Sequence, residues 1–233
     1  MNHTATVTGR LSSTNPNLQN ISNNPIKQIF NSRFNDGVIV EVDFNQLEVV
    51  ALAHVTRDTQ LIYDIKRGVD IHSALYEGMF GRPPTKEERK PFKARTFQLI
   101  YGAGAKAISK QAIAKQAGCS LDEAKKFVDV FYTRYPQVGE WHTKFEEEVE
   151  SKSTYELDDD GFREKVKTFV LNTETGRKFL FKEYFNDSSW STRTYNFSPT
   201  ELKNYPIQGL ATGDIVPMML GIIFRSLEGR DDV

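Results

Sequence analysis

The sequence of 233 residues has a single cysteine, Cys119, which excludes an internal disulfide framework and offers no metal-site spacing. It has no signal-peptide pattern at its start and no uninterrupted run of about 18 apolar residues, the length that a membrane span needs. These absences favour a cytoplasmic protein without a membrane partner, in the host cytoplasm if the source is a virus. We interpret Cys119 as a packing residue rather than a reactive thiol.

Acidic residues are missing from one end of the chain. Residues 1–35 contain no Asp or Glu and eight Asn, whereas residues 122–160 hold 12 acidic and 5 basic residues. The net charge is −1, so the rest of the chain has an excess of six positive charges. Charge segregated in this way allows one face to bind nucleic acid while another stays solvated.

A basic and aromatic stripe is predicted near the middle of the chain. Arg89, Lys93, Phe97 and Tyr101 recur every four residues, so on a helix they form a slowly winding row about 18 Å long. Two cations followed by two aromatic rings suit a ligand with phosphates at one end and a flat base at the other. Spacing alone leaves an amphipathic surface helix equally open. Gly102 predicts the end of the helix.

The pattern Arg-x-x-x-Lys-x-x-x-Phe-x-x-x-Tyr-Gly resembles the nucleotide-binding finger helix of family A DNA polymerases. This resemblance implies that Arg89 and Lys93 are catalytic and neutralise the phosphates of a deoxynucleoside triphosphate (dNTP). It implies that Phe97 packs against the base and sugar, and that Tyr101 stacks where the template base enters. Arg89 is expected near the N-terminus of the helix, where the helix dipole also favours an anion.

A second motif surrounds Asp43. The β-branched run at 38–44 predicts a short strand that ends near Asp43, where a carboxylate can hold Mg²⁺ or cap the following helix. Asp-Phe-Asn-Gln-Leu-Glu is similar to the Asp-Tyr-Ser-Gln-Ile-Glu metal motif of the same family. By that resemblance Asp43 and the Phe44 carbonyl bind two Mg²⁺ ions, Gln46 contacts the nucleotide, and Glu48 excludes ribonucleotides.

The first 21 residues are rich in Gly, Ser, Pro and Asn, which predicts ordered loops or a polar, partly disordered terminus. Neutral amides in such loops can bind base edges in a minor groove, whose acceptor pattern is nearly independent of sequence. Thr-Gly-Arg-Leu-Ser-Ser and Asn-Leu-Gln-Asn-Ile resemble the family's primer–template segment. The resemblance implies that Arg10, Asn17 and Asn20 contact DNA.

Two further segments resemble the same family. Asp-Ile-His at 70–72 opens a predicted helix, and the resemblance gives His72 a contact with the nucleotide phosphates, although a single His is more often structural. Asn-Tyr-Pro-Ile-Gln-Gly implies that Asn204 and Gln208 read the primer–template minor groove. Asp214 is expected to cap or pair rather than to bind metal. Gly213 makes the helix after Gln208 less certain.

We interpret the remaining segments as structural rather than functional. Residues 105–150 favour two or three helices, with a capping box at Ser120 and Glu123 and a helix end at Tyr135. Residues 151–198 are polar and rich in aromatics, and a solvated turn is expected at 158–161.

Together these motifs predict a helix-rich α+β fold, with a partial polymerase palm containing a short antiparallel sheet and a helical fingers subdomain. The expected divisions are 1–60 for palm and primer–template loop, 61–150 for fingers, and 151–233 for a return to palm. The resemblance implies a DNA-directed DNA polymerase fragment, of phage type or from a split gene, that joins dNTP to a primer 3′-OH on template DNA.

The family's second metal-binding carboxylate, on a His-Asp-Glu hairpin, has no counterpart in the sequence; Asp231 and Asp232 fit a polar tail. We therefore expect a complementary polypeptide to supply it. The alternatives are a non-catalytic remnant that binds primer–template, a single-subunit RNA polymerase relative, and an unrelated helical interaction module. Glu48 and Phe97 favour deoxyribonucleotides over the RNA polymerase alternative.

Overall fold

The computed structural model describes residues 6–21, 25–32, 36–39, 41–114, 118–157, 164–184 and 197–230. The first helical elements are η1 (Leu18–Asn20), η2 (Pro25–Ile29), α1 (Leu47–Thr56), α2 (Thr59–Lys66), α3 (Ile71–Phe80), α4 (Lys86–Ile100), α5 (Ala105–Ala114), α6 (Leu121–Arg134) and α7 (Pro136–Lys152). They are followed by strands β1 (Thr154–Leu157), β2 (Glu164–Asn172) and β3 (Lys178–Tyr184), and by α8 (Pro199–Gln208), the π-helical segment η3 (Gly209–Ile215) and α9 (Val216–Leu227).

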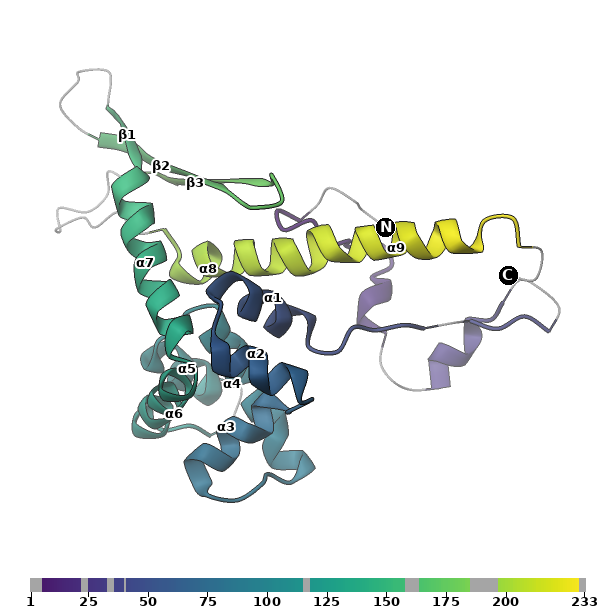
Figure 1. Ribbon diagram of the computed structural model, residues 1–233, viewed down its shortest axis with the longest axis horizontal. Helices are drawn as coiled ribbons and strands as arrows, with labels where there is room; N and C mark the ends of the chain where they lie inside the picture. Colours follow the sequence, from purple (N-terminus) through teal and green to yellow (C-terminus); the bar gives the residue numbers. More distant parts are fainter. Residues whose placement is uncertain are drawn as a thin grey trace.

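The helices α2–α6 form one body, and α7 rises from it to the three-stranded sheet (Figure 1). The segment α8–η3–α9 makes one long helix across the molecule, and α1 packs against α7, α8 and η3. A first buried cluster, around Leu52, Leu99 and Phe127, holds the helical body together. A second cluster, around Phe145 and Phe169, joins α7 to the sheet. The predicted helix-rich α+β fold with a short antiparallel sheet is confirmed.

Local sequence signals explain where α4 begins and ends. The Thr85 hydroxyl accepts from the Glu88 N–H while the Glu88 carboxylate accepts from the Thr85 N–H, a complete capping box. Helix α4 ends at Ile100, and Gly102 takes a positive φ of 75° just beyond it. Pro91 lies inside the helix rather than in its first turn, and α4 continues through it. Arg89 is the fourth helical residue, close to the N-terminus as expected.

The strand predicted at 38–44 is wrong for the residues that the structure describes there. Residues 36–39 and 41–44 have no regular secondary structure, and the side chains of Val38, Ile39 and Val42 are 79%, 61% and 78% exposed. A strand is stabilised by hydrogen bonds to a neighbouring strand, and no described segment pairs with this one. β-branched composition alone therefore does not produce a strand here.

The sheet lies at 154–184, in a segment where the sequence predicted turns but placed no strand. Its order is β1-β2-β3, antiparallel throughout, with Phe169 opposite Phe181 in the register of β2 and β3. The β2–β3 turn is closed by a hydrogen bond from the Gly176 N–H to the Thr173 carbonyl. Charged residues obscure the strand pattern in the sequence. Lys167 in β2 is buried and pairs with Glu150 at 2.5 Å, although a lysine is normally expected to face solvent.

A helix follows Gln208, although Gly213 made it less certain from sequence; Pro217 is also tolerated, at the second position of α9. The helix passes without a break from α8 to α9 through the π-helical segment η3, which contains Gly213. By length and composition alone, residues 199–227 are the one described helix that could cross a membrane; such a match is weak, because core helices of soluble proteins share it. In α6, the predicted capping box of Ser120 and Glu123 is present.

Candidate nucleotide and primer–template site

Helix α4 arranges the basic and aromatic stripe as its spacing predicts. The rings of Phe97 and Tyr101 lie 6.5 Å apart between centroids and are inclined by 28°, so they stack along one face. Both rings are half-buried, whereas Lys93 one turn before Phe97 is exposed. Among the described residues Lys93 has no hydrogen-bond or ion-pair partner. The stripe therefore presents an unpaired cation next to a partly open aromatic surface.

The end of α4 is joined to two other predicted segments through Tyr101. Its hydroxyl donates a hydrogen bond to the carboxylate of Glu48 in α1, which also lies 3.9 Å from the Arg10 guanidinium. Burial, together with this hydrogen bond, raises the pKa of Tyr101, and a contact with Gln208 opposes the rise. Gln208 in turn accepts a hydrogen bond from the Thr8 hydroxyl at 2.7 Å. Tyr101, Glu48, Arg10 and Gln208, each singled out from sequence, thus converge.

Arg89 lies at the other end of the stripe and has an intramolecular partner. Its Nε and Nη2 donate hydrogen bonds of 2.6 and 2.7 Å to the two carboxylate oxygens of Asp70. Burial alone would raise the pKa of Asp70, but the hydrogen bonds from Arg89 and Ser73 outweigh it and lower that pKa to about 2. Asp70 was not singled out from sequence as an interacting residue, because its partner lies 19 positions further along the chain.

His72 lies behind the stripe. It is 2% exposed, and its ring centroid is 5.6 Å from that of Phe97. Its Nδ1 is buried without a hydrogen-bond partner. Burial lowers the pKa of His72 and Asp70 opposes this effect, while the charges of Arg89 and Lys93 act in the same direction as burial; together they bring the pKa to about 4. The imidazole is therefore neutral at pH 7, and the phosphate contact proposed for it stays a prediction.

The segment that leads into α1 carries the predicted metal residues. Asp43 is exposed, has no partner among the described residues and does not cap α1, whose N-cap is Gln46. The alternative that Asp43 is a helix cap is therefore wrong. Gln46 adopts a left-handed conformation with φ of 53°, and its Oε1 is buried without a partner. No group of three His, Cys, Asp or Glu that could hold a metal occurs among the described residues.

The N-terminal loop lies against the long helix. A Cβ on Gly213 of η3 would stand 2.4 Å from the carbonyl oxygen of Thr8, so only glycine permits this close crossing. The Asn17 side chain accepts from the Gln19 N–H and caps η1. The side chain of Asn20 lies outside the described residues, so its predicted DNA contact cannot be placed. The loop is thus ordered by local hydrogen bonds and by contact with η3.

Residues of the β2–β3 turn also contact η3. Arg177 donates to the Asp214 carboxylate from Nε at 3.0 Å and from Nη2 at 2.6 Å, and Thr175 donates to the same carboxylate at 2.7 Å. Asp214 therefore pairs, as expected, and fixes the turn to η3. Asn204 lies one turn before Gln208 in α8, and its Oδ1 is buried without a partner.

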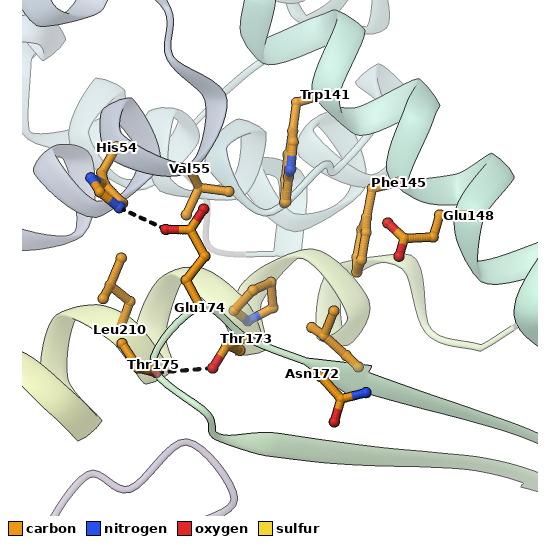
Figure 2. A pocket seen from close by; sticks show the side chains of 12 residues that line it. His54, Val55, Trp141, Phe145, Glu148, Asn172, Thr173, Glu174, Thr175 and Leu210 are labelled. Atoms are coloured by element: carbon orange, nitrogen blue, oxygen red, sulfur yellow. Dashed lines mark hydrogen bonds and ion pairs between the residues drawn. The ribbon is translucent and has the colours of Figure 1, made fainter.

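A cavity of about 290 Å³ lies apart from the stripe, between α1, α7 and the β2–β3 turn (Figure 2). Trp141 and Phe145 stack along one wall with their rings inclined by only 6°. His54 faces Glu174 across the opening, with 3.3 Å between Nε2 and Oε2. None of the residues predicted from sequence to bind nucleotide, metal or DNA lines this cavity. We therefore place the candidate site at α4 and not in the cavity.

The family of the chain is shown by its similarity to known proteins. A family model for DNA polymerase family A matches residues 1–231. The chain is 31% identical to DNA polymerase I of Caldicellulosiruptor bescii over 97% of its length, and 29% identical to DNA polymerase I of Geobacillus stearothermophilus over 98%. The chain belongs to DNA polymerase family A.

One solved structure extends the comparison to the fold. The POL domain of Pol1 from M. smegmatis, in a complex with DNA primer–template and dNTP, matches 97% of this chain with a TM-score of 0.64 and 26% identity. The chain covers 37% of that structure, and it spans about a quarter of the two curated relatives, 24% of each. The likeness therefore concerns one portion of a larger polymerase.

Proposed function

We propose that this chain carries the nucleotide-binding portion of a DNA-directed DNA polymerase. The reaction is attack of a primer 3′-OH on the α-phosphate of a dNTP, directed by template DNA; the bond between the α-phosphate and the bridging oxygen breaks, pyrophosphate leaves, and the hydroxyl proton is released. Lys93 and Arg89 neutralise the phosphates, and Phe97 packs against the base and sugar. Tyr101 occupies the place where the template base enters. A cytoplasmic location, that of the host if the source is a phage, follows from this role.

The observation that carries the proposal is the junction at Tyr101. Its hydrogen bond to Glu48, with Arg10 and Gln208 beside it, joins the finger helix to the segments proposed to bind sugar and DNA. A site that checks base, sugar and primer–template together needs these groups in one place. A helical module with another role would not require the three segments to meet.

Mg²⁺ is proposed as the cofactor, held by Asp43 and the Phe44 carbonyl. Asp43 fits this role because its carboxylate is exposed and makes no competing hydrogen bond among the described residues. When bound, Mg²⁺ stabilises negative charge on the phosphates during transfer. The second carboxylate of a two-ion site is proposed to come from a further polypeptide segment, because two-ion chemistry needs ligands on both sides of the ion pair.

The same proposal assigns the remaining residues and divisions. His72 contacts the phosphates, Gln46 contacts the nucleotide, and Glu48 excludes ribonucleotides by crowding the sugar 2′ position. The minor groove of the primer–template is contacted by Arg10, Asn17, Asn20, Asn204 and Gln208. Residues 1–60 and 151–233 act as palm, and 61–150 act as fingers.

Binding of dATP tests the proposal without requiring a complete metal site. The affinity of the chain for dATP is measured in the presence of a primer–template duplex and Ca²⁺. Lys93→Ala is expected to weaken dATP binding about tenfold, the effect of losing one charge-assisted contact. Lys110→Ala, which removes an exposed lysine of α5 away from the stripe, is the matched control and should leave the affinity unchanged.

Primer extension separates catalysis from binding. With Mg²⁺, the chain alone is expected to extend a primer little or not at all, and strong extension would refute the need for a second carboxylate. Where a completed complex extends primers, Asp43→Asn should abolish extension but leave duplex binding intact. If a completed complex binds the primer–template duplex but does not extend the primer, the alternative of a non-catalytic primer–template binder is favoured.

A further inference from the structure

The Arg89–Asp70 pair uses only one edge of the guanidinium. Nε and one N–H of Nη2 are bonded to Asp70, at 2.6 and 2.7 Å. An arginine has five N–H donors, so three remain, two on Nη1 and one on Nη2. The Arg89 side chain is 39% exposed, and these remaining donors have no hydrogen-bond partner among the described residues. The guanidinium is therefore fixed on one side and available on the other.

Asp70 is itself held firmly. It is the N-cap of α3, where its Oδ2 accepts from the backbone N–H of Ser73 at 3.1 Å and from the Ser73 hydroxyl. A carboxylate fixed at a helix N-terminus and bonded to a bidentate partner has little freedom to rotate. The pair thus ties the first turn of α4 to the first turn of α3, two residues before His72.

We propose that Asp70 is a positioning residue, which holds Arg89 so that its open edge meets the phosphates of an incoming nucleoside triphosphate. This inference rests on the proposed function, because only there is Arg89 assigned to the triphosphate. The pair is neutral as a whole, so Arg89 acts through directed donors. Lys93, which has no partner among the described residues, supplies the net positive charge.

Two other roles of the Arg89–Asp70 pair predict a different effect of Asp70 substitutions on nucleotide affinity. If Asp70 were a competitor that occupies Arg89 until a triphosphate displaces it, removal of its charge would tighten binding. If the pair were only a brace between α3 and α4, its loss would lower stability without a specific effect on nucleotide affinity. If Asp70 orients Arg89, its loss weakens nucleotide binding, and only when Arg89 is present.

The test compares dATP affinities in a double-mutant cycle of Asp70→Asn and Arg89→Ala in the chain, again with primer–template and Ca²⁺. Asparagine keeps the N-cap of α3, because its side-chain oxygen also accepts from the Ser73 N–H. Asp70→Asn is expected to weaken dATP binding about five- to tenfold, comparable to losing the orientation of one bidentate contact. In the Arg89→Ala background it should have no further effect.

Controls separate positioning from stability. Ser73→Ala removes a hydroxyl contact to Asp70 but leaves the pair with Arg89, and should change dATP affinity less than twofold. The affinity for the primer–template duplex reports general damage and should stay close to wild type in Asp70→Asn. Loss of the ion pair is expected to lower the unfolding midpoint, so all affinities are measured at a temperature at which every variant is folded. Inorganic tripolyphosphate, used in place of dATP, should show the same ranking of variants because it presents the phosphates alone.

Each pattern of results has one meaning. Weaker dATP binding in Asp70→Asn that disappears in the Arg89→Ala background supports the positioning role. Unchanged or tighter binding in Asp70→Asn, while Arg89→Ala still weakens binding, overturns the role of Asp70 and leaves the proposed function standing. If wild-type chain does not bind dATP, or Arg89→Ala binds as tightly, the assignment of Arg89 fails and the inference fails with it.

Discussion

The hydroxyl of Tyr101, at the end of α4, donates a hydrogen bond to the carboxylate of Glu48 in α1. The two residues are 53 positions apart in sequence, and Glu48 is 16% exposed. Removing a carboxylate from water is costly unless its oxygens are hydrogen-bonded, so the Tyr101 hydroxyl favours the side-chain position that Glu48 adopts here. The bond therefore links the position of the finger helix to the side chain proposed to test the sugar.

Shortening Glu48 should relax discrimination between sugars. In Glu48→Ala the space proposed for the 2′ position opens, so GTP affinity should rise about tenfold relative to dGTP affinity. Tyr101→Phe keeps the ring but removes the donor that fixes Glu48, and should shift the ratio in the same direction by a smaller factor. Competition of GTP and dGTP for the chain bound to primer–template measures both. An unchanged ratio in Glu48→Ala would contradict the role of Glu48.

Helix starts and the spacing of side chains along a helix could be predicted from neighbouring residues in the sequence. The Thr85–Glu88 and Ser120–Glu123 capping boxes lie within four residues, and sequence places such helix starts well. The four-residue spacing also placed Phe97 and Tyr101 on one face of α4. These features depend on neighbours in the chain, so they could be predicted without knowledge of the tertiary structure.

Features that depend on distant partners could not be predicted in this way. The run at 38–44 has strand composition but no described pairing partner, whereas β2 has a mixed composition and two partners. Asp70 gave no signal of its pairing with Arg89, and Thr8 gave none of its contact with Gln208. Strand pairing and ion pairs between distant residues are tertiary features, and one sequence does not specify which segments meet.

Gly102 should not tolerate a side chain. Its φ is 75°, and a Cβ would lie 2.3 Å from Cδ of Lys203 in α8. Gly102→Ala should lower the free energy of unfolding by about 2–4 kcal/mol, from left-handed strain and overpacking together. Adding Lys203→Ala removes the overlap and should make the cost of Gly102→Ala smaller, by about 1–2 kcal/mol. Urea unfolding of the four chains measures this, and an equal cost in both backgrounds would exclude the overlap with Lys203.

The contact between Arg177 and Asp214 should stabilise the β2–β3 turn against η3. The two side chains are 28% and 22% exposed and share two hydrogen bonds. Arg177→Ala and Asp214→Asn are each expected to cost about 1–3 kcal/mol, with a coupling of about 1–2 kcal/mol in the double variant. Urea unfolding supplies the free energies, with Lys178→Ala as a control outside the pair. Strict additivity would show that the two side chains stabilise the protein independently.

His142 should make the protein less stable in mild acid. The imidazole is 4% exposed; Nδ1 lies 3.0 Å from the Tyr132 hydroxyl and Nε2 lies 3.3 Å from the Ile100 carbonyl oxygen. Burial and the nearby ammonium of Lys203, which is paired with Glu146, lower the pKa of His142, and the hydrogen bond to the Ile100 carbonyl opposes them; together they bring the pKa to about 4. A neutral ring fits both contacts, because one nitrogen can accept from Tyr132 while the other donates to Ile100.

The sign of the effect follows from which state binds protons. An unfolded histidine is protonated below pH 6.5, whereas native His142 stays neutral down to about pH 4, so protons favour the unfolded chain between these values. From pH 7 to pH 5 this residue should cost about 2 kcal/mol of unfolding free energy, and buried His72 should add a similar loss. His142→Gln keeps a donor and an acceptor without a titrating group, and should remove about half of the combined loss. Urea unfolding at pH 7 and pH 5 measures this decrease in unfolding free energy. If His142→Gln shows the same decrease as the wild type, the acid sensitivity belongs to other groups.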